Sequence, residues 1–248
     1  MDFIRVTSEN LDKEHICCAI SGAEAQKKKE WMKNRFEEGL IFLKANVRGK
    51  CFIECIPAEY AWVPVKAEGY MYINCLWVSG QYKGHGYSNS LLEQCIQISK
   101  AEGKKGLVIL SSDKKRGFLA DATYLEHKGF QVCDTAMPYF RLMVMPFENG
   151  EDKPVFREQV KHPEPYTEGF VLYYTDQCPF TSKYVPILAK MARERNVTFK
   201  EVHFTSAEQA QASYSPFSTF SLYYNGEFLT HEILSEKKFE KILAEKNC

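Results

Sequence analysis

Tyr72-Ile-Asn-Cys-Leu-Trp-Val78, followed by Gln81-Tyr-Lys-Gly-His-Gly86 and a segment with apolar residues at helical spacing, decides the fold. The apolar run predicts a β-strand, the glycine pair predicts a loop, and the periodic segment predicts a helix. Glycines let the backbone approach an anion closely, and free N–H groups at the start of a helix point towards it. The stretch therefore predicts a phosphate-binding turn.

The spacing of the glycines indicates which phosphate is bound. Gly84 and Gly86 fill the first two positions of G-x-G-x-x-G, but Asn89 stands in the third, so the Rossmann fingerprint is broken. The Gly-Lys-Ser/Thr ending of a nucleoside-triphosphate loop is also absent. What remains is Gln-x-x-Gly-x-Gly shortly after an apolar strand, which resembles the acetyl-CoA pyrophosphate loop of the GNAT family of N-acetyltransferases.

This resemblance implies that acetyl-CoA is a cosubstrate held by the strand and the loop. The strand's outer backbone groups would pair with the pantetheine arm, and the loop amides would donate to the pyrophosphate. The residues expected to bind it are Leu76, Trp77, Val78, Gln81, Tyr82, Lys83, Gly84, His85, Gly86 and Tyr87. The alternative is a plain strand–helix turn that needs glycines only for its shape.

The candidate catalytic groups are a tyrosine and two carboxylates. GNAT proteins often carry a helix ending in Tyr-x-x-x-Gly-Phe, whose tyrosine protonates the departing CoA thiolate; here Tyr124 stands one place too early before Gly129. One residue turns a helical side chain by about 100°, so Tyr124 is either this acid or a core residue. Glu68, before the long strand, and Glu54, on the preceding hairpin, are candidate bases, with direct proton loss to solvent as the alternative.

The C-terminal part begins with a second strand–helix unit. Cys178 precedes Pro179 at the predicted start of a helix, where a thioredoxin places its nucleophile, but Thr181 replaces the second cysteine of a dithiol pair. The order β-α-β-α-β-β-α predicts a thioredoxin-like domain. Together with Pro216-Phe-Ser-Thr-Phe-Ser-Leu-Tyr-Tyr-Asn-Gly226, this arrangement resembles the YoaP-like C-terminal domain of some bacterial acetyltransferases.

The predicted fold class is α/β (α+β), a GNAT fold with a mixed, splayed sheet and a smaller thioredoxin-like α/β domain. We place the acetyltransferase domain at 1–147, a proline-rich linker at 148–168 and the second domain at 169–248. Residues 23–38, 84–100 and 118–127 are expected to be helices, and 61–65 is expected to continue a hairpin formed by 40–47 and 50–56. The apolar run Leu107-Val-Ile-Leu110 predicts a buried parallel strand.

Composition indicates which partners, which compartment and which metal sites are expected. The net charge of 0 gives no sign of a nucleic-acid or membrane-surface partner. The chain shows neither a bilayer-spanning stretch nor a signal peptide. The 9 cysteines, without a Cys-x-x-Cys pair, favour free thiols in the cytoplasm, and no histidine pair completes a metal set with Cys51 and Cys55. The basic run Lys27–Lys29 is expected on a solvated helix face.

The sequence therefore predicts a cytoplasmic, bacterial acetyl-CoA-dependent N-acetyltransferase that needs no metal. The acetyl group would pass directly to a primary amine of a small molecule or a peptide, and a homodimer is compatible with the sequence. The first alternative is a thiol-based redox or adduct sensor that uses Cys178 beside a degenerate acyl-CoA domain. The second is a non-catalytic acyl-CoA-binding scaffold.

Overall fold

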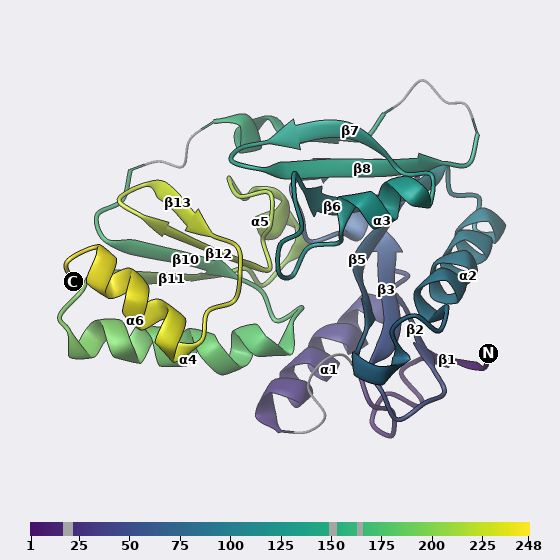
Figure 1. The fold of residues 1–248 in the computed structure, drawn as a ribbon, viewed down its shortest axis with the longest axis horizontal. Helices are drawn as coiled ribbons and strands as arrows, with labels where there is room; N and C mark the ends of the chain where they lie inside the picture. Colours follow the sequence, from purple (N-terminus) through teal and green to yellow (C-terminus); the bar gives the residue numbers. More distant parts are fainter. Residues whose placement is uncertain (17–21, 149–152, 163–165) are drawn as a thin grey trace.

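The computed structural model describes residues 1–16, 22–148, 153–162 and 166–248, and its ribbon divides into two lobes (Figure 1). The N-terminal lobe is built on a 7-stranded sheet of order β1-β2-β3-β5-β6-β8-β7. Its strands are β1 (Phe3–Val6), β2 (Ile41–Ala45), β3 (Cys51–Pro57), β5 (Met71–Val78), β6 (Gly106–Ser112), β7 (Gln131–Ala136) and β8 (Phe140–Pro146). The helices of this lobe are α1 (Ala23–Phe36), α2 (Tyr87–Ala101) and α3 (Ala122–His127).

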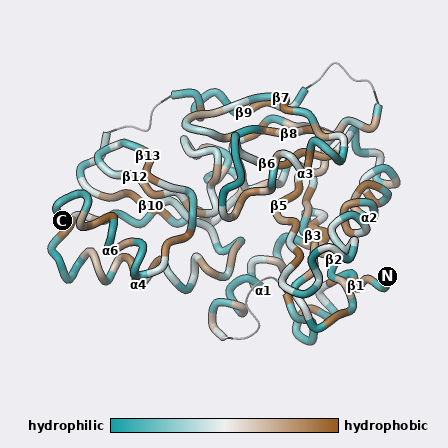
Figure 2. Tube along the Cα trace, viewed as in Figure 1, coloured by the Kyte–Doolittle hydropathy of each residue, from teal (hydrophilic) through white to brown (hydrophobic). Residues whose placement is uncertain are grey.

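Both faces of this sheet are buried. On β6, Leu107 and Ile109 belong to a core shared with α2 and α3, whereas Val108 and Leu110 belong to a core shared with α1 and the C-terminal lobe. Strands covered on both sides are expected to be apolar throughout, and Figure 2 shows hydrophobic colours along β3 and β5 at the centre of the sheet. The prediction of a buried parallel strand at Leu107–Leu110 is confirmed, since β5 and β6 run parallel.

The centre of the sheet opens where β5 and β6 separate. The two strands pair only from Met71 to Ile73 on β5, and the rest of β5 has no partner on that side within the described residues. The other edge of β5 stays paired with β3 as far as Val78, apart from a register shift beside Glu54. This divergence is the splay that the resemblance predicted.

The C-terminal lobe has a 4-stranded sheet of order β11-β10-β12-β13. Strand β10 is parallel to β11 and antiparallel to β12, and the chain order β10-α4-β11-α5-β12-β13-α6 is the predicted one. The likeness to thioredoxin itself stays a prediction. The elements are β10 (Phe170–Tyr174), α4 (Pro179–Glu194), β11 (Phe199–His203), α5 (Ala207–Gln211), β12 (Phe220–Tyr224), β13 (Glu227–Thr230) and α6 (Glu236–Glu245).

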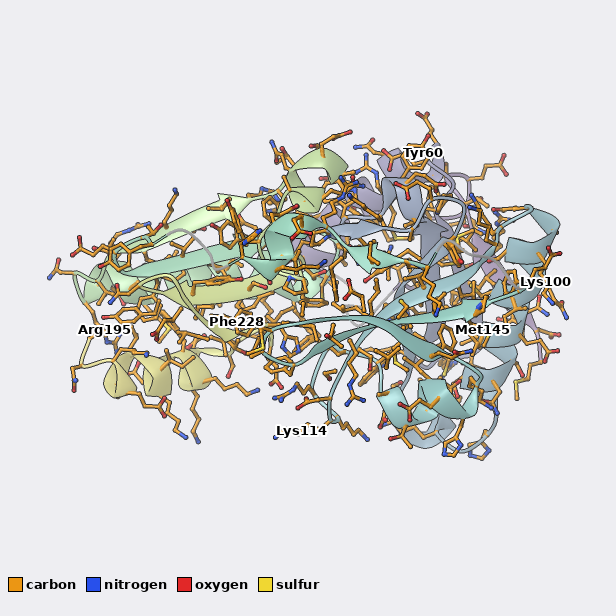
Figure 3. All side chains as sticks on the ribbon, turned by 90° about the horizontal axis from the view of Figure 1, so that it is seen from above. Tyr60, Lys100, Lys114, Met145, Arg195 and Phe228 are labelled. Atoms are coloured by element: carbon orange, nitrogen blue, oxygen red, sulfur yellow. The ribbon has the colours of Figure 1, made fainter. Side chains whose placement is uncertain are left out.

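One of the hydrophobic clusters spans both lobes, and each lobe also has a cluster of its own. Phe204 and Ala210 of the C-terminal lobe are buried in the same cluster as Trp62 and Phe140 of the N-terminal lobe. Phe228 packs edge-on against Phe140, with ring centroids 5.8 Å apart. In Figure 3, Arg195 and Lys100 lie towards opposite ends of the molecule, and Phe228 lies between them.

Three segments differ from the sequence-based expectation. Helix α3 begins at Ala122 rather than 118, because Phe118 has φ 63 and the Asp121 carboxylate caps the helix by accepting from the Thr123 amide. Residues 61–65 do not extend the hairpin. There, the short strand β4 (Val65–Lys66) pairs with β9 (Val155–Phe156). Part of the predicted linker thus folds onto the first lobe, while 149–152 and 163–165 lie outside the described residues.

Candidate functional site

A cleft occupies the splay between β5 and β6. Its volume is about 470 Å³, open space included, and it is lined by β5 from Tyr72 to Trp77, by Ile109 and Leu110, by 118–120 and by Phe217. Of the β5 residues expected to bind a cofactor, Leu76 and Trp77 line this cleft, whereas Val78 packs on the α2 side of the sheet. An unpaired strand edge beside a cleft can take an extended ligand in place of a strand.

The glycine loop follows β5 and leads into α2. Gly84 and Gly86 both have φ 80, and Gly86 precedes the first residue of the helix. Such dihedrals strongly favour glycine. A Cβ placed on Gly84 would meet no heavy atom within 4 Å, so the space in front of the loop is open.

The loop offers backbone donors to an anion. Within the described part of the chain, the amides from Gly84 to Asn89 donate to no protein acceptor, and the first amide of this region with a partner is that of Ser90, which donates to Gly86. Lys83 is exposed beside them, with Nζ 5.7 Å from the centre of the Trp77 ring. Free amides, a helix N-terminus and a nearby ammonium group together fit a pyrophosphate.

Tyr124 faces the start of α2. Leu125 fills the core position and is fully buried, whereas the Tyr124 hydroxyl lies 3.4 Å from Asn89 Oδ1 and is half-buried. Burial raises the pKa of Tyr124, partly offset by a hydrogen bond with Ser88. The one-residue shift in the sequence thus leaves the phenol beside the same helix terminus that carries the free amides.

A second cavity lies between the lobes, next to the first. It has a volume of about 490 Å³, open space included, and Asn74, Cys75, Phe118 and Phe217 line both cavities. The C-terminal lobe contributes Gln177, Cys178, Pro179, Phe217 and Thr219 to it. Cys178 immediately precedes α4, as predicted, and is in no disulfide.

A buried ion pair adjoins this second cavity. Lys28 Nζ lies 2.6 Å from Glu54 Oε2, and the two side chains are 0% and 2% exposed. Glu54 Oε1 accepts from Asn74 Nδ2 at 2.9 Å. The prediction that Lys27–Lys29 forms a solvated face is therefore wrong for Lys28, because α1 presents this side chain to the Glu54 carboxylate. Sequence reasoning missed Lys28 and Asn74, although Glu54 was a candidate.

A bulge in β5 explains the position of Asn74. Glu54 pairs with Cys75 but Cys55 pairs with Ile73, so β5 carries one residue more than β3 at this point. A bulge shifts the alternation of side chains. Cys75 accordingly packs on the same face as Tyr72, where strict alternation would have placed it with Ile73.

Glu68 is not part of this constellation. It is exposed and precedes β5, whereas the glycine loop and the start of α2 follow the other end of that strand. An 8-residue strand is roughly 26 Å long at about 3.3 Å per residue. The structure therefore does not bring Glu68 to Tyr124.

The lobes are joined beside Phe118. Tyr139 Oη lies 2.7 Å from His231 Nδ1, and His231 Nε2 lies 2.9 Å from the Gly117 carbonyl oxygen, so Nε2 carries the proton and Tyr139 donates to Nδ1. Burial lowers the pKa of His231, whose side chain is 1% exposed. Glu232 accepts from the Gly117 amide at 3.2 Å. These contacts fix the segment that carries Phe118 into both cavities.

The described residues contain neither a metal-ligand cluster nor a membrane-spanning helix. Among residues 1–16, 22–148, 153–162 and 166–248, no three His, Cys, Asp or Glu side chains are grouped so that they could hold a metal ion. Over the same residues, no helix combines the length and apolar character needed to cross a membrane. The expectation that no metal is needed stays a prediction.

Two family models match separate parts of the chain. Residues 9–130 match the model of the acetyltransferase (GNAT) family, and residues 199–241 match the YoaP-like family. The uncharacterized N-acetyltransferase YoaP of Bacillus subtilis (strain 168) is 42% identical over 247 residues, covering 98% of each chain.

Solved acetyltransferase structures resemble part of this chain. A putative GNAT acetyltransferase from Desulfovibrio desulfuricans is 15% identical with a TM-score of 0.44, covering 58% of this chain and 98% of its own. The PaiA N-acetyltransferase of Thermoplasma acidophilum, solved in complex with coenzyme A, is 18% identical with a TM-score of 0.41. The match covers 59% of this chain and 100% of the PaiA chain.

Proposed function

Since this chain belongs to the GNAT family of acetyltransferases and carries a YoaP-like domain, we propose that it transfers the acetyl group of acetyl-CoA directly to a primary amine. The observation that carries the proposal is that three features lie around the junction of β5 with α2. These are the unpaired edge of β5 beyond Ile73, the free amides of the glycine loop, and the phenol of Tyr124.

The first two features support acetyl-CoA as the donor. The edge of β5 can hydrogen-bond an amide-containing arm, and the loop from Gly84 to Asn89 presents donors to a pyrophosphate. Lys83 adds a positive charge, and the indole of Trp77 is 44% exposed beside it. Acetyl-CoA supplies the acetyl group already activated as a thioester.

Tyr124 is the proposed acid. In the transfer, the amine nitrogen forms a bond to the acetyl carbon, the carbon–sulfur bond breaks, and the thiolate takes the Tyr124 proton. Burial raises the pKa of this phenol, so it keeps its proton at neutral pH. The hydroxyl regains a proton from solvent after CoA leaves.

The amine would enter through the cavity between the lobes, which joins the cleft at Asn74 and Cys75. Glu54 is a poor base there because Lys28 and Asn74 each occupy one of its carboxylate oxygens. Glu68 is too remote. We therefore assign neither carboxylate, and the amine proton passes to water.

The comparisons give the redox-sensor alternative no support. We assign Cys178 to the wall of the cavity between the lobes, which we call the acceptor cavity. The domain boundaries at 147 and 169, a cytoplasmic location, a homodimer and the absence of a nucleic-acid partner stay predictions of the sequence.

The test is release of free CoA thiol by the full chain with acetyl-CoA and a panel of primary amines. We expect amine-dependent release, and we expect acetyl-CoA and CoA to raise the melting temperature, because a ligand of the native state stabilises it. Greater stabilisation by NAD or ATP than by CoA would overturn the proposal.

A further inference from the structure

Asn74 lines both cavities, and only the nitrogen of its side-chain amide makes a hydrogen bond among the described residues. Its Nδ2 donates to Glu54, but its Oδ1 is buried and accepts no hydrogen bond among the described residues. A buried acceptor without a donor is costly and calls for an explanation. Because Asn74 lines both cavities, a molecule bound there can supply the missing donor.

The ion pair fixes which way the Asn74 amide points. A carboxylate only accepts hydrogen bonds, and the Lys28 ammonium lies 2.6 Å from the other oxygen of Glu54. The Asn74 NH₂ group must therefore face Glu54, and its carbonyl oxygen must face elsewhere. Lys28, buried on α1, thus determines the orientation of an acceptor on β5.

Apart from Gln177 and Thr219, the rest of the acceptor cavity is apolar, and it carries no net charge. Phe52, Phe118 and Phe217 supply aromatic walls, and Glu54, already neutralised by Lys28, is the one charged side chain among its described lining residues. A second cationic group on the acceptor would have no partner in this cavity. A single amine on an apolar body would bury its body against the rings.

We infer that the cavity between the lobes selects monoamines with an apolar body, and that Asn74 Oδ1 accepts an N–H of the reacting amine and orients it. This inference rests on the proposed function. The hydrogen bond turns the amine so that its lone pair is free for the acetyl carbon, while Lys28 and Glu54 act as positioning residues through Asn74.

The experiment compares 2-phenylethylamine with spermidine as acceptors for the wild type and for Asn74→Leu. We expect the wild type to favour 2-phenylethylamine in kcat/KM. Asn74→Leu should lower kcat/KM for this amine at least about tenfold, as expected for the loss of one buried hydrogen bond, and should change the KM for acetyl-CoA less. If the leucine variant does not fold, Asn74→Ser replaces it in the same comparison. Its hydroxyl can still donate to Glu54, and the same loss of kcat/KM for 2-phenylethylamine is expected.

Ser99→Ala is the matched control, since Ser99 Oγ is also buried without a partner but lies on α2, outside both cavities. It should leave both KM values within about twofold of the wild type, the scatter expected away from the site. A preference for spermidine, or an Asn74→Leu effect no larger than that of Ser99→Ala, would overturn the inference and leave acetyl transfer standing.

Calorimetric titration of 2-phenylethylamine into the CoA-saturated protein decides the inference even without turnover. Binding to the wild type that Asn74→Leu weakens at least about tenfold supports it. Absence of binding, or equal binding by the two proteins, contradicts it. Absence of CoA release with every amine, despite such binding, would refute the proposed function alone.

Discussion

The hydroxyl of Tyr124 lies 3.4 Å from Oδ1 of Asn89, so a phenol on α3 meets the first turn of α2, where the backbone amides are free. The ring of Tyr124 packs against the core, and its hydroxyl lies beside the free amides at the start of α2. Leu125, its neighbour on α3, is the residue that fills the core.

Tyr124→Phe should lower kcat by about 100- to 10,000-fold, the usual contribution of general acid–base catalysis, with the Kd for acetyl-CoA nearly unchanged. Tyr60→Phe, at a tyrosine that is 48% exposed, is the control. Because the pKa of Tyr124 is raised, its protonated form persists to higher pH than in an ordinary tyrosine. The Tyr124-dependent rate should therefore not fall between about pH 7 and 9. A loss of kcat of only about twofold would contradict the acid role and indicate that Tyr124 only packs against its neighbours.

Gly84→Ala should weaken acetyl-CoA binding by about 10- to 150-fold, the equivalent of one hydrogen bond to a charged group. The added methyl fills the open space in front of the loop, and φ 80 adds strain. Gly103→Ala is a close control, because Gly103 has φ 69, equally open surroundings and a position at the other end of α2. Titration calorimetry with CoA measures the Kd of both variants. Equal loss of binding in the two variants would contradict the assignment of the loop.

Lys28→Met should destabilise the protein by about 3–5 kcal/mol, because it leaves the buried Glu54 charge unpaired. Adding Glu54→Leu should restore most of that loss, since an apolar pair of similar volume is often tolerated. Lys33→Met, on the same helix, breaks an exposed pair with Asp12 and should cost less than about 1 kcal/mol. Urea unfolding gives all three values, and equal losses for Lys28→Met and Lys33→Met would contradict the buried pair.

His231→Gln should reduce the loss of stability on acidification. The pKa of His231 is lowered in the folded protein, so the unfolded chain binds more protons as the pH falls below about 6.5. The contribution of neutral His231 is thus full above that pH and declines below it. Urea unfolding at pH 7.5 and 5.5 should show a smaller difference for His231→Gln than for the wild type. His162→Gln, at a side chain that is 64% exposed, should behave like the wild type.

The sequence predicts the parts of the site that depend on local chemistry. The glycine loop, the apolar β6 run and the start of α4 at Cys178–Pro179 follow from backbone freedom, burial and proline geometry. These elements are found with bounds shifted by a few residues. The order of helices and strands along the C-terminal part of the chain follows in the same way.

The parts that depend on long-range packing could not be predicted. Burial of Lys28 requires the pairing of α1 with β3, and the orientation of Asn74 requires a bulge that no local pattern marks. The walls of the acceptor cavity come from lobes far apart in the sequence, as Cys75 and Cys178 show. Each of these features depends on contacts between distant segments rather than on residue type alone.

Direct transfer is tested most directly by mass spectrometry after a single turnover with acetyl-CoA that carries an isotopically labelled acetyl group. The account predicts that the label moves to the primary amine in step with release of free CoA, with no label on the protein at any time. Label retained on acetyl-CoA with every amine, or an acetyl group trapped on Cys75 or Cys178, would contradict it.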